Sequence, residues 1–259
     1  MTDEIKAVLM EAVHSAGDII KEFFEGRYEV SHKEGINNLV TEVDKLSEKR
    51  IIEIIKSSFP KHSIISEEGG SEENDSEYHW IIDPIDGTVN FAHNIPICCV
   101  SIGVKKNQEM LIGAVYNPIL NEFFYAEKGN GATLNGKKIQ VSGQTDFNKA
   151  CLVTGFPYLW ANVKGEPVKV FEKFVKQGLP VRRLGSAAID LCWVACGRFD
   201  GFWEYNLNPW DIAAGYLIVQ EAGGTITNFE GKSYSVFDKE TLATNGNIHK
   251  EMLQTINAI

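Results

Sequence analysis

The sequence predicts a mixed fold with an α+β first part and an α/β second part. Two segments with helical periodicity open the chain, short apolar runs separated by turn residues follow, and strand-like and helix-like segments alternate after about residue 145. The spacing of apolar residues distinguishes helices from strands, and the order of these elements distinguishes an α+β arrangement from an α/β one. We therefore expect residues 1–145 to form an α+β part and residues 146–259 an α/β part.

The first part is expected to begin with two long amphipathic helices. Apolar residues recur at helical spacing between Ile5 and Phe23, and again between Val43 and Phe59, through Leu46, before Pro60 ends the second helix. Both helices should precede the first strand. Apolar runs at 98–104, 110–116 and 122–126 then predict an antiparallel meander, with glycine and asparagine in the hairpin turns at 128–131 and 135–136.

The second part alternates between strands and helices. Strands are expected at 151–154 and 181–184, around Phe202, and near Thr225 and Ala243. Helices are expected through Val168 and Phe174, at 187–196 and at 209–222. This alternation is typical of an α/β arrangement.

Composition excludes several classes of protein. A chain of 259 residues with 44% hydrophobic residues can bury a large core, and a net charge of −10 argues against a nucleic-acid-binding surface. Five cysteines without zinc-like spacing, an acidic N-terminal segment and the lack of a bilayer-length apolar run predict a cytoplasmic protein with reduced thiols and no membrane partner.

The segment at 80–91 carries the strongest chemical pattern. A buried-strand pattern brings Asp83 to its end, and Pro84 and Gly87 favour a tight turn that directs Asp83, the Ile85 carbonyl and Asp86 into one small volume. Two carboxylates held so close repel each other unless a cation lies between them. Oxygen ligands without nearby histidine or cysteine favour a hard cation such as Mg²⁺.

Three other acidic segments are candidates, each with an ordinary structural alternative. Asp211 follows Asn208 and Pro209 at a helix start, where it could simply complement the helix dipole. The pair at 67–68 precedes two glycines and could be a solvated turn. Asp44 lies three residues after Thr41, so it could be only a capping-box partner.

Other phosphate-binding schemes fit the sequence less well. The glycines at 129–131 lack the third glycine of a dinucleotide fingerprint, and an EF-hand beginning at Asp83 would have Asn94 where glutamate is required. The run 86–88 resembles the end of the haloacid-dehalogenase motif. Pro84 occupies the position of the nucleophilic aspartate in that motif, so a covalent aspartyl-phosphate route is disfavoured.

Taken together, these segments resemble the lithium-sensitive, magnesium-dependent inositol monophosphatase family over nearly the whole chain. Residues 80–91 resemble its first signature and 210–224 its second, while Asp44, Glu67 and Glu68 fall where the family has acidic site residues. The resemblance implies a layered α/β/α/β/α sandwich of the sugar-phosphatase type. It also implies a homodimer and inhibition by lithium.

The resemblance assigns roles to individual residues. Glu67, Asp83 and the Ile85 carbonyl would hold one Mg²⁺, and Asp83, Asp86 and Asp211 a second; Glu67 would share a loosely bound third ion through waters. Thr88, paired with Asp44, would orient a metal-activated water that attacks phosphorus directly, without a phosphoenzyme. The implied substrate-binding residues are Asp86, Gly87, Thr88, Arg182, Ser186, Ala187, Glu204 and Asp211.

The implied activity is magnesium-dependent hydrolysis of a small polyol or sugar monophosphate, with inositol 1-phosphate as the leading substrate. Fructose 1,6-bisphosphate, NADP, histidinol phosphate and 3′-phosphoadenosine 5′-phosphate are alternatives within the same scaffold. Two other classes stay open: a regulatory binding protein of the transcription machinery, and a structural metal-binding module.

Overall fold

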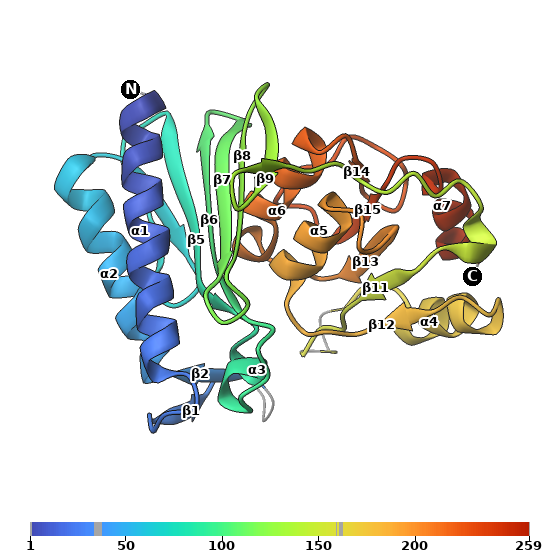
Figure 1. Cartoon of the computed structure of the whole chain (residues 1–259), viewed down its shortest axis with the longest axis horizontal. Coiled ribbons are helices and arrows are strands. Elements are labelled where there is room, and N and C mark those ends of the chain that lie inside the picture. The colour runs from blue at the N-terminus through green and yellow to red at the C-terminus, as the bar shows by residue number, and fades with distance from the viewer. Residues whose placement is uncertain (1, 34–37, 159, 161–162, 259) are drawn as a thin grey trace.

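The computed structural model describes residues 2–33, 38–158, 160 and 163–258, and it stacks helices and sheets in five alternating layers (Figure 1). Helices α1 (Thr2–Phe23) and α2 (Glu42–Ser58) form one outer layer; α4 (Pro167–Lys176) and α7 (His249–Asn257) form the other. Helices α5 (Ala187–Ala195) and α6 (Pro209–Glu221) fill the layer between the two main sheets. The expected α/β/α/β/α sandwich is confirmed.

The larger sheet contains eight strands in the spatial order β10-β9-β8-β7-β6-β5-β3-β4. Their bounds are β3 (Ser63–Ser66), β4 (Gly70–Glu72), β5 (Tyr78–Asp86), β6 (Cys99–Lys106), β7 (Glu109–Asn117), β8 (Glu122–Glu127), β9 (Gly131–Leu134) and β10 (Lys137–Lys138). Strands β6 to β10 pair with their neighbours in sequence and run antiparallel, which confirms the predicted meander. A short helix, α3 (Thr88–Ala92), follows β5 directly.

The smaller main sheet has five strands in the order β12-β11-β13-β15-β14. They are β11 (Leu152–Thr154), β12 (Val181–Arg182), β13 (Gly201–Tyr205), β14 (Thr225–Thr227) and β15 (Glu240–Thr244), and a 3₁₀ turn (Phe147–Lys149) precedes them. Strand β11 runs parallel to β12 and β13, as the alternating pattern predicts. The division of the chain at residue 145 stays a prediction, because α6 packs against strands of both sheets.

Two expectations about the helical segment were wrong. A hairpin of β1 (Val30–His32) and β2 (Leu39–Thr41) lies between α1 and α2, so the two helices do not precede every strand. Three-residue strands are too short to show a period, and β1 is exposed throughout. Leu46, expected on the apolar face of α2, is 44% exposed, whereas Asp44, Ser47 and Glu48 are buried.

Helix α6 lies unusually close to the larger sheet. A Cβ atom at Gly113 would lie 3.0 Å from the Cα of Ala214, and one at Gly103 would lie 2.9 Å from the Cβ of Ala213. Glycine on β6 and β7 therefore gives α6 room to approach the sheet. This close packing brings the first turn of α6 next to the end of β5.

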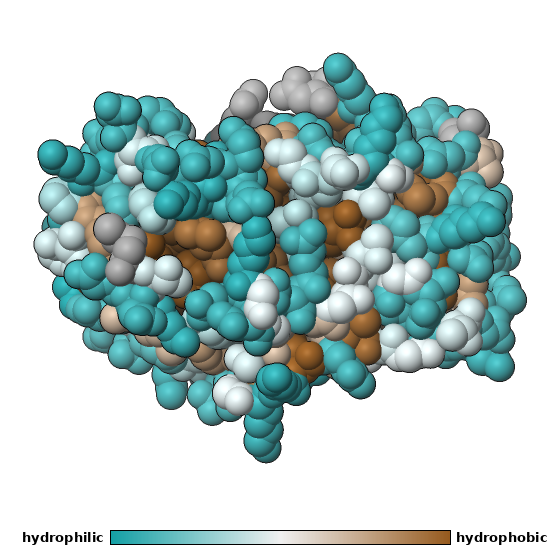
Figure 2. Space-filling model, turned by 90° about the horizontal axis from the view of Figure 1, so that it is seen from above, coloured by the Kyte–Doolittle hydropathy of each residue, from teal (hydrophilic) through white to brown (hydrophobic). Residues whose placement is uncertain are grey.

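The molecular surface is mainly hydrophilic on the face that Figure 2 shows. Apolar residues on this face, viewed from above, lie in recesses between the hydrophilic ones (Figure 2). Within the described residues, no helix has the length and apolar character needed to cross a membrane.

Candidate active site

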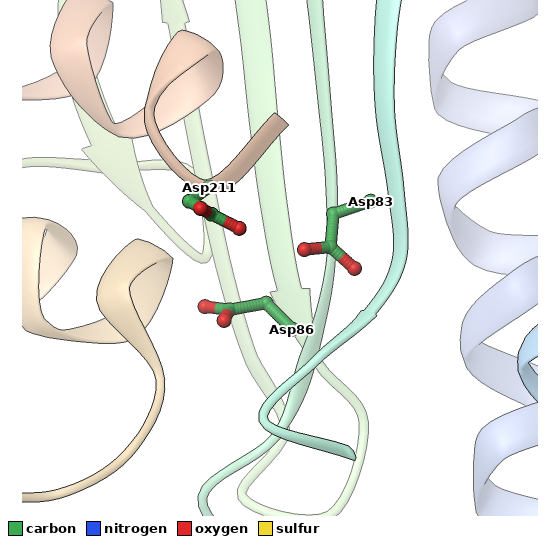
Figure 3. Close-up of side chains that lie close together, drawn as sticks. All are labelled: Asp83, Asp86 and Asp211. Atoms are coloured by element: carbon green, nitrogen blue, oxygen red, sulfur yellow. The ribbon is translucent and has the colours of Figure 1, made fainter. Parts of the chain in front are cut away.

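Three aspartates from two distant parts of the chain meet between the larger sheet and α6. Asp83 and Asp86 come from β5, and Asp211 comes from the first turn of α6. Each offers a carboxylate oxygen, and these oxygens all lie within 4.8 Å of one another. Figure 3 shows the three carboxylates directed toward one shared space. The structure therefore brings together two acidic motifs that are far apart in the sequence.

A local irregularity in β5 places Asp83 and Asp86 on the same side. Asp83 is opposite Ser101 and Asp86 is opposite Cys99, so three steps along β5 match two steps along β6. In a regular strand, residues three apart point to opposite faces. The extra residue restores a common direction. Pro84 lies inside this irregularity, where no hydrogen bond to β6 requires its missing N–H.

Each of the three carboxylates has one oxygen fixed by a hydrogen bond from the backbone. The Ile85 amide donates to Asp83 Oδ1 at 3.0 Å, and the Asn208 amide donates to Asp211 Oδ2 at 2.7 Å. Asp86 Oδ2 accepts from the Ala188 amide at 2.7 Å and also from Ser186 Oγ at 2.6 Å. These bonds hold the acids in place before any ligand binds, which is the arrangement expected of a preorganised site.

Burial and mutual repulsion make the ionised state of this cluster unfavourable without a cation. Burial raises the pKa of Asp83 well above its ordinary value, and the charges of Glu67, Asp86 and Asp211 raise it further. The pKa of Asp211 is raised in the same way, chiefly by burial. Burial raises the pKa of Asp86 to about 6, although Ser186 and Ala188 partly offset it. Because a divalent cation would relieve both effects, this all-oxygen donor set fits Mg²⁺.

Glu67 reaches the same region from the turn after β3, but in the structure it contacts a lysine. Lys33 Nζ lies 2.7 Å from Glu67 Oε1 and also forms an ion pair with Glu68. Burial raises the pKa of Glu67, and the charge of Lys33 opposes that rise. Glu67 lines the same cavity as Asp83, so it lies within reach of a cation there. The ammonium of Lys33 compensates the charge of Glu67 in this arrangement.

Thr88 and Asp44 form a hydrogen-bonded pair beside the aspartate cluster. Thr88 Oγ1 donates its single proton either to Asp44 Oδ1, 2.9 Å away, or to the Ile85 carbonyl, 3.0 Å away. Asp44 Oδ2 accepts from the Thr41 amide and hydroxyl, which completes the capping box of α2. Burial raises the pKa of Asp44 to about 6, and its bonds to Thr41 and Thr88 oppose the rise. Asp44 is therefore both a cap and the partner of Thr88.

The aspartate cluster lines a cleft with a volume of about 180 Å³. The three aspartates, Glu67 and Thr88 line one part of it, and Gly87, Ser186 and Ala187 are also in its wall. Glu204, Asp190, Arg183 and Tyr158 also line the cleft, and the charges of Glu204 and Arg183 both act on Asp190. Glu204 packs against Gly155, where a Cβ atom would overlap its carboxylate oxygens. The cleft thus joins an acidic cluster to a region suited to a polar organic group.

Most residues predicted to form the site line this cleft; Asp44 lies behind Thr88, to which it is hydrogen-bonded, and Arg182 does not line the cleft. Arg182 is exposed, and its Nη1 donates to the carbonyl of Val181. The neighbouring Arg183 lines the cleft instead. Adjacent residues of an extended segment point to opposite sides, so the sequence marks the basic pair without showing which member faces inward. Asp190, inside an apolar helical pattern, was also missed, although an acid in such a pattern is a usable signal.

Known proteins resemble this chain over nearly its whole length. A model of the inositol monophosphatase family matches residues 1–259. The inositol-1-monophosphatase of Synechocystis sp. is 44% identical over 254 residues, which cover 97% of this chain and 88% of that protein. The Nus factor SuhB of Haemophilus influenzae is 41% identical over 251 residues, covering 96% and 94%.

A solved structure agrees with these matches. The IMPase of Thermotoga maritima has a TM-score of 0.88 and 37% identity, with 99% of this chain and 97% of that chain covered. Both the sequence match and the structural match extend over nearly the full length, and the acidic motifs lie within the matched region. The chain therefore belongs to the inositol monophosphatase family.

Proposed function

We propose that the protein is a magnesium-dependent phosphomonoesterase that hydrolyses small polyol or sugar monophosphates, with inositol 1-phosphate as its preferred substrate. The observation that carries the proposal is the convergence of Asp83, Asp86 and Asp211 beside the Thr88–Asp44 pair. The family match and the inositol-1-monophosphatase of Synechocystis support the same activity.

The residues that would hold the ions are those predicted from the sequence. Glu67, Asp83 and the Ile85 carbonyl would hold one Mg²⁺, and Asp83, Asp86 and Asp211 a second, with a third near Glu67. Bound Mg²⁺ would supply charge neutralisation for the phosphate oxygens and would lower the pKa of water. Lys33 would have to leave Glu67 at least in part, because a lysine ammonium and a divalent cation compete for the same carboxylate.

The chain's own groups account for orientation and proton transfer: the proton of the water would pass to Thr88 Oγ1 as the proton of Thr88 passes to Asp44 Oδ1. With its proton donated to Asp44, Thr88 Oγ1 presents a lone pair to the cleft and can accept a hydrogen bond from the attacking water. An ionised Asp44 favours this orientation of the Thr88 hydroxyl, because a carboxylate is a stronger acceptor than the Ile85 carbonyl. No side chain needs to form a covalent bond with phosphorus, which agrees with Pro84 standing where a nucleophilic aspartate would be required.

A substrate panel tests the proposal. Phosphate release would be measured from inositol 1-phosphate, fructose 1,6-bisphosphate, NADP, histidinol phosphate and 3′-phosphoadenosine 5′-phosphate, with Mg²⁺ and with a chelator. We expect magnesium-dependent release, fastest from inositol 1-phosphate, and its loss in Asp83→Asn. Release from none of the five substrates would refute the enzyme assignment, whereas a preference for another ester would refute only the proposed substrate.

A second candidate function is a regulatory role in the transcription machinery. It is favoured by the Nus factor SuhB of Haemophilus influenzae, which is 41% identical over almost the whole chain. Asp83→Asn separates the two functions: a cellular role that survives loss of hydrolysis would make binding the main function. A role that disappears together with hydrolysis would favour the enzyme.

We also infer a homodimer that is inhibited by lithium, as the family resemblance implies, and a cytoplasmic location, as the cysteine pattern indicates. Sedimentation equilibrium would give the oligomeric state. Phosphate release in increasing LiCl, against NaCl at equal ionic strength, would test the inhibition.

A further inference from the structure

Asp190 is a buried acid that the proposed chemistry does not use. It lies in the first turn of α5, is 1% exposed, and lines the cleft together with Glu204. Its Oδ1 has no hydrogen-bond partner among the residues that the structure describes. A buried oxygen without a partner costs free energy, so a native protein usually keeps one only where something else satisfies it.

The surroundings of Asp190 indicate what that partner would be. Burial raises its pKa well above the ordinary value, the charges of Glu204 and Asp86 raise it further, and Arg183 opposes them. Burial likewise raises the pKa of Glu204, with further contributions from Asp211 and Asp86. Two acids and one guanidinium make this part of the cleft unfavourable for a second anionic group. An alcohol hydroxyl, which can both donate and accept, suits it better.

We propose that Asp190 is a specificity-determining residue that hydrogen-bonds a hydroxyl of the substrate's polyol group. This inference rests on the proposed function, since it concerns the alcohol portion of the same ester. In that arrangement Asp86 and Asp211 hold the phosphate end through bound ions, while Asp190 and Glu204 contact the opposite end of the substrate. Asp190 would then select polyhydroxylated alcohols over apolar alcohols of equal size.

A matched pair of esters isolates this contact. Inositol 1-phosphate and cyclohexyl phosphate share a six-membered ring and a phosphate, but only the first carries ring hydroxyls. We expect Asp190→Ala to lower kcat/KM for inositol 1-phosphate at least about tenfold and to leave cyclohexyl phosphate little changed. Asp190→Asn, which keeps an acceptor and a donor, should recover most of the loss. An equal loss on both esters, or no loss on either, would overturn the proposal.

Asp200 provides the control for a merely structural effect. It is also buried, but its carboxylate accepts hydrogen bonds from Ser142 Oγ and from the Cys151 amide. Asp200→Ala should therefore lower the midpoint temperature of unfolding and leave the ratio of the two esters unchanged. Asp190→Ala should change the ratio without lowering the midpoint temperature. A clear fall in midpoint temperature for Asp190→Ala would indicate a structural role and contradict the inference.

A measurement of alcohol binding tests the Asp190 contact independently of catalysis. Saturation-transfer NMR would compare free inositol with cyclohexanol on the wild-type protein and on Asp190→Ala. A signal for inositol that Asp190→Ala removes supports the contact even if no ester is hydrolysed, in which case only the proposed function fails. An inositol signal that is the same in both proteins, or absent from both, would refute the contact.

Discussion

At the scale of single residues, the hydroxyl of Thr88 and the carboxylate of Asp44 form the pair to which we assign orientation of the attacking water. The Thr88 hydroxyl lies 2.9 Å from Asp44 Oδ1, and Asp44 is fully buried. Asp44 also caps α2 through Thr41, so a change at Asp44 mixes chemistry with stability. Substitutions of its two hydrogen-bond partners, Thr88 and Thr41, separate the effect on chemistry from the effect on stability.

We expect Thr88→Val to lower kcat by about 10²- to 10⁴-fold, the usual range for loss of a proton-transfer group. Thr88 has no part in the cap of α2, so the free energy of unfolding of Thr88→Val should differ little from that of the wild-type protein. Thr41→Val removes the hydroxyl cap and should lower the free energy of unfolding by about 1 kcal/mol while keeping most of the activity. Steady-state kinetics and urea unfolding of both variants check this. The assignment fails if Thr88→Val retains activity comparable to that of Thr41→Val.

The raised pKa values of the aspartates predict how pH and magnesium affect stability together. In the folded protein without metal, Asp86 takes up a proton below about pH 6, whereas in the unfolded chain an aspartate does so near 3.9. The ionised group therefore lowers stability above about pH 6, and this penalty disappears as the pH falls toward 4. Magnesium removes the same penalty, so its stabilising effect should be large at pH 7.5 and small at pH 5.

Thermal unfolding with and without MgCl₂ at the two pH values measures this difference. Asp83→Asn provides the control, because loss of one carboxylate should reduce the shift caused by magnesium at pH 7.5. An equal shift at both pH values would contradict the linkage between the aspartates and the metal.

At this scale the sequence predicted which acids converge, because each lies at the end or start of an element with a clear pattern. The resemblance pointed to Arg182, whereas Arg183 lines the cleft, because the sequence does not show the direction in which adjacent side chains point. The ion pair of Lys33 with Glu67 was also missed. Its partners are 34 residues apart, and no local pattern relates them.

At the scale of elements, the junction between β5 and α3 determines the geometry of the site. Gly87 has φ +89°, and a Cβ atom there would lie 2.8 Å from the Ile97 carbonyl oxygen and 3.2 Å from that of Gly185. The sequence predicted a tight turn at Pro84 and Gly87 but not the continuation of β5 through Asp86. A bulge depends on pairing with β6, which the sequence of β5 alone does not contain.

Gly87→Ala should therefore reduce both stability and activity. The positive φ alone costs about 1 kcal/mol for a residue with a Cβ atom, and the contact with backbone oxygens adds to that cost. Gly129→Ala is a matched control, because Gly129 has φ +79° but nothing within 4 Å of the added Cβ. Urea unfolding and phosphate release should show a larger loss for Gly87→Ala in both quantities. Equal losses would show that the Ile97 contact is unimportant.

At the scale of the whole molecule, α6 connects the two sheets and brings Asp211 to Asp83 and Asp86. It packs against β5, β6 and β7 of the larger sheet and against β14 of the smaller one. The sequence predicted the order of these elements, because apolar runs mark the longer strands and Asn208 and Pro209 mark the start of α6. It did not predict the β1-β2 hairpin, because no pattern in the sequence marks strands so short. It also did not predict how closely α6 packs against the sheet, because that distance depends on glycines in other elements.

Gly113→Ala tests the role of this close packing. The added methyl group would lie 3.0 Å from the Cα of Ala214, which is tighter than ordinary contact, and overpacking of this kind costs about 1–3 kcal/mol. Because the displaced element carries Asp211, magnesium-dependent activity should fall as well. Gly143→Ala is the control, since its Cβ would meet nothing within 4 Å. Unchanged stability and activity in Gly113→Ala would show that α6 can shift without consequence for the site.

The most direct test of the account is a crystal structure of the protein grown with magnesium and inorganic phosphate. We expect at least two ions held by Asp83, Asp86 and Asp211, with Glu67 turned from Lys33 toward the metal and phosphate oxygens on the ions near Thr88. The account would be contradicted if the three aspartates held no metal at saturating magnesium, or if phosphate bound elsewhere in the molecule.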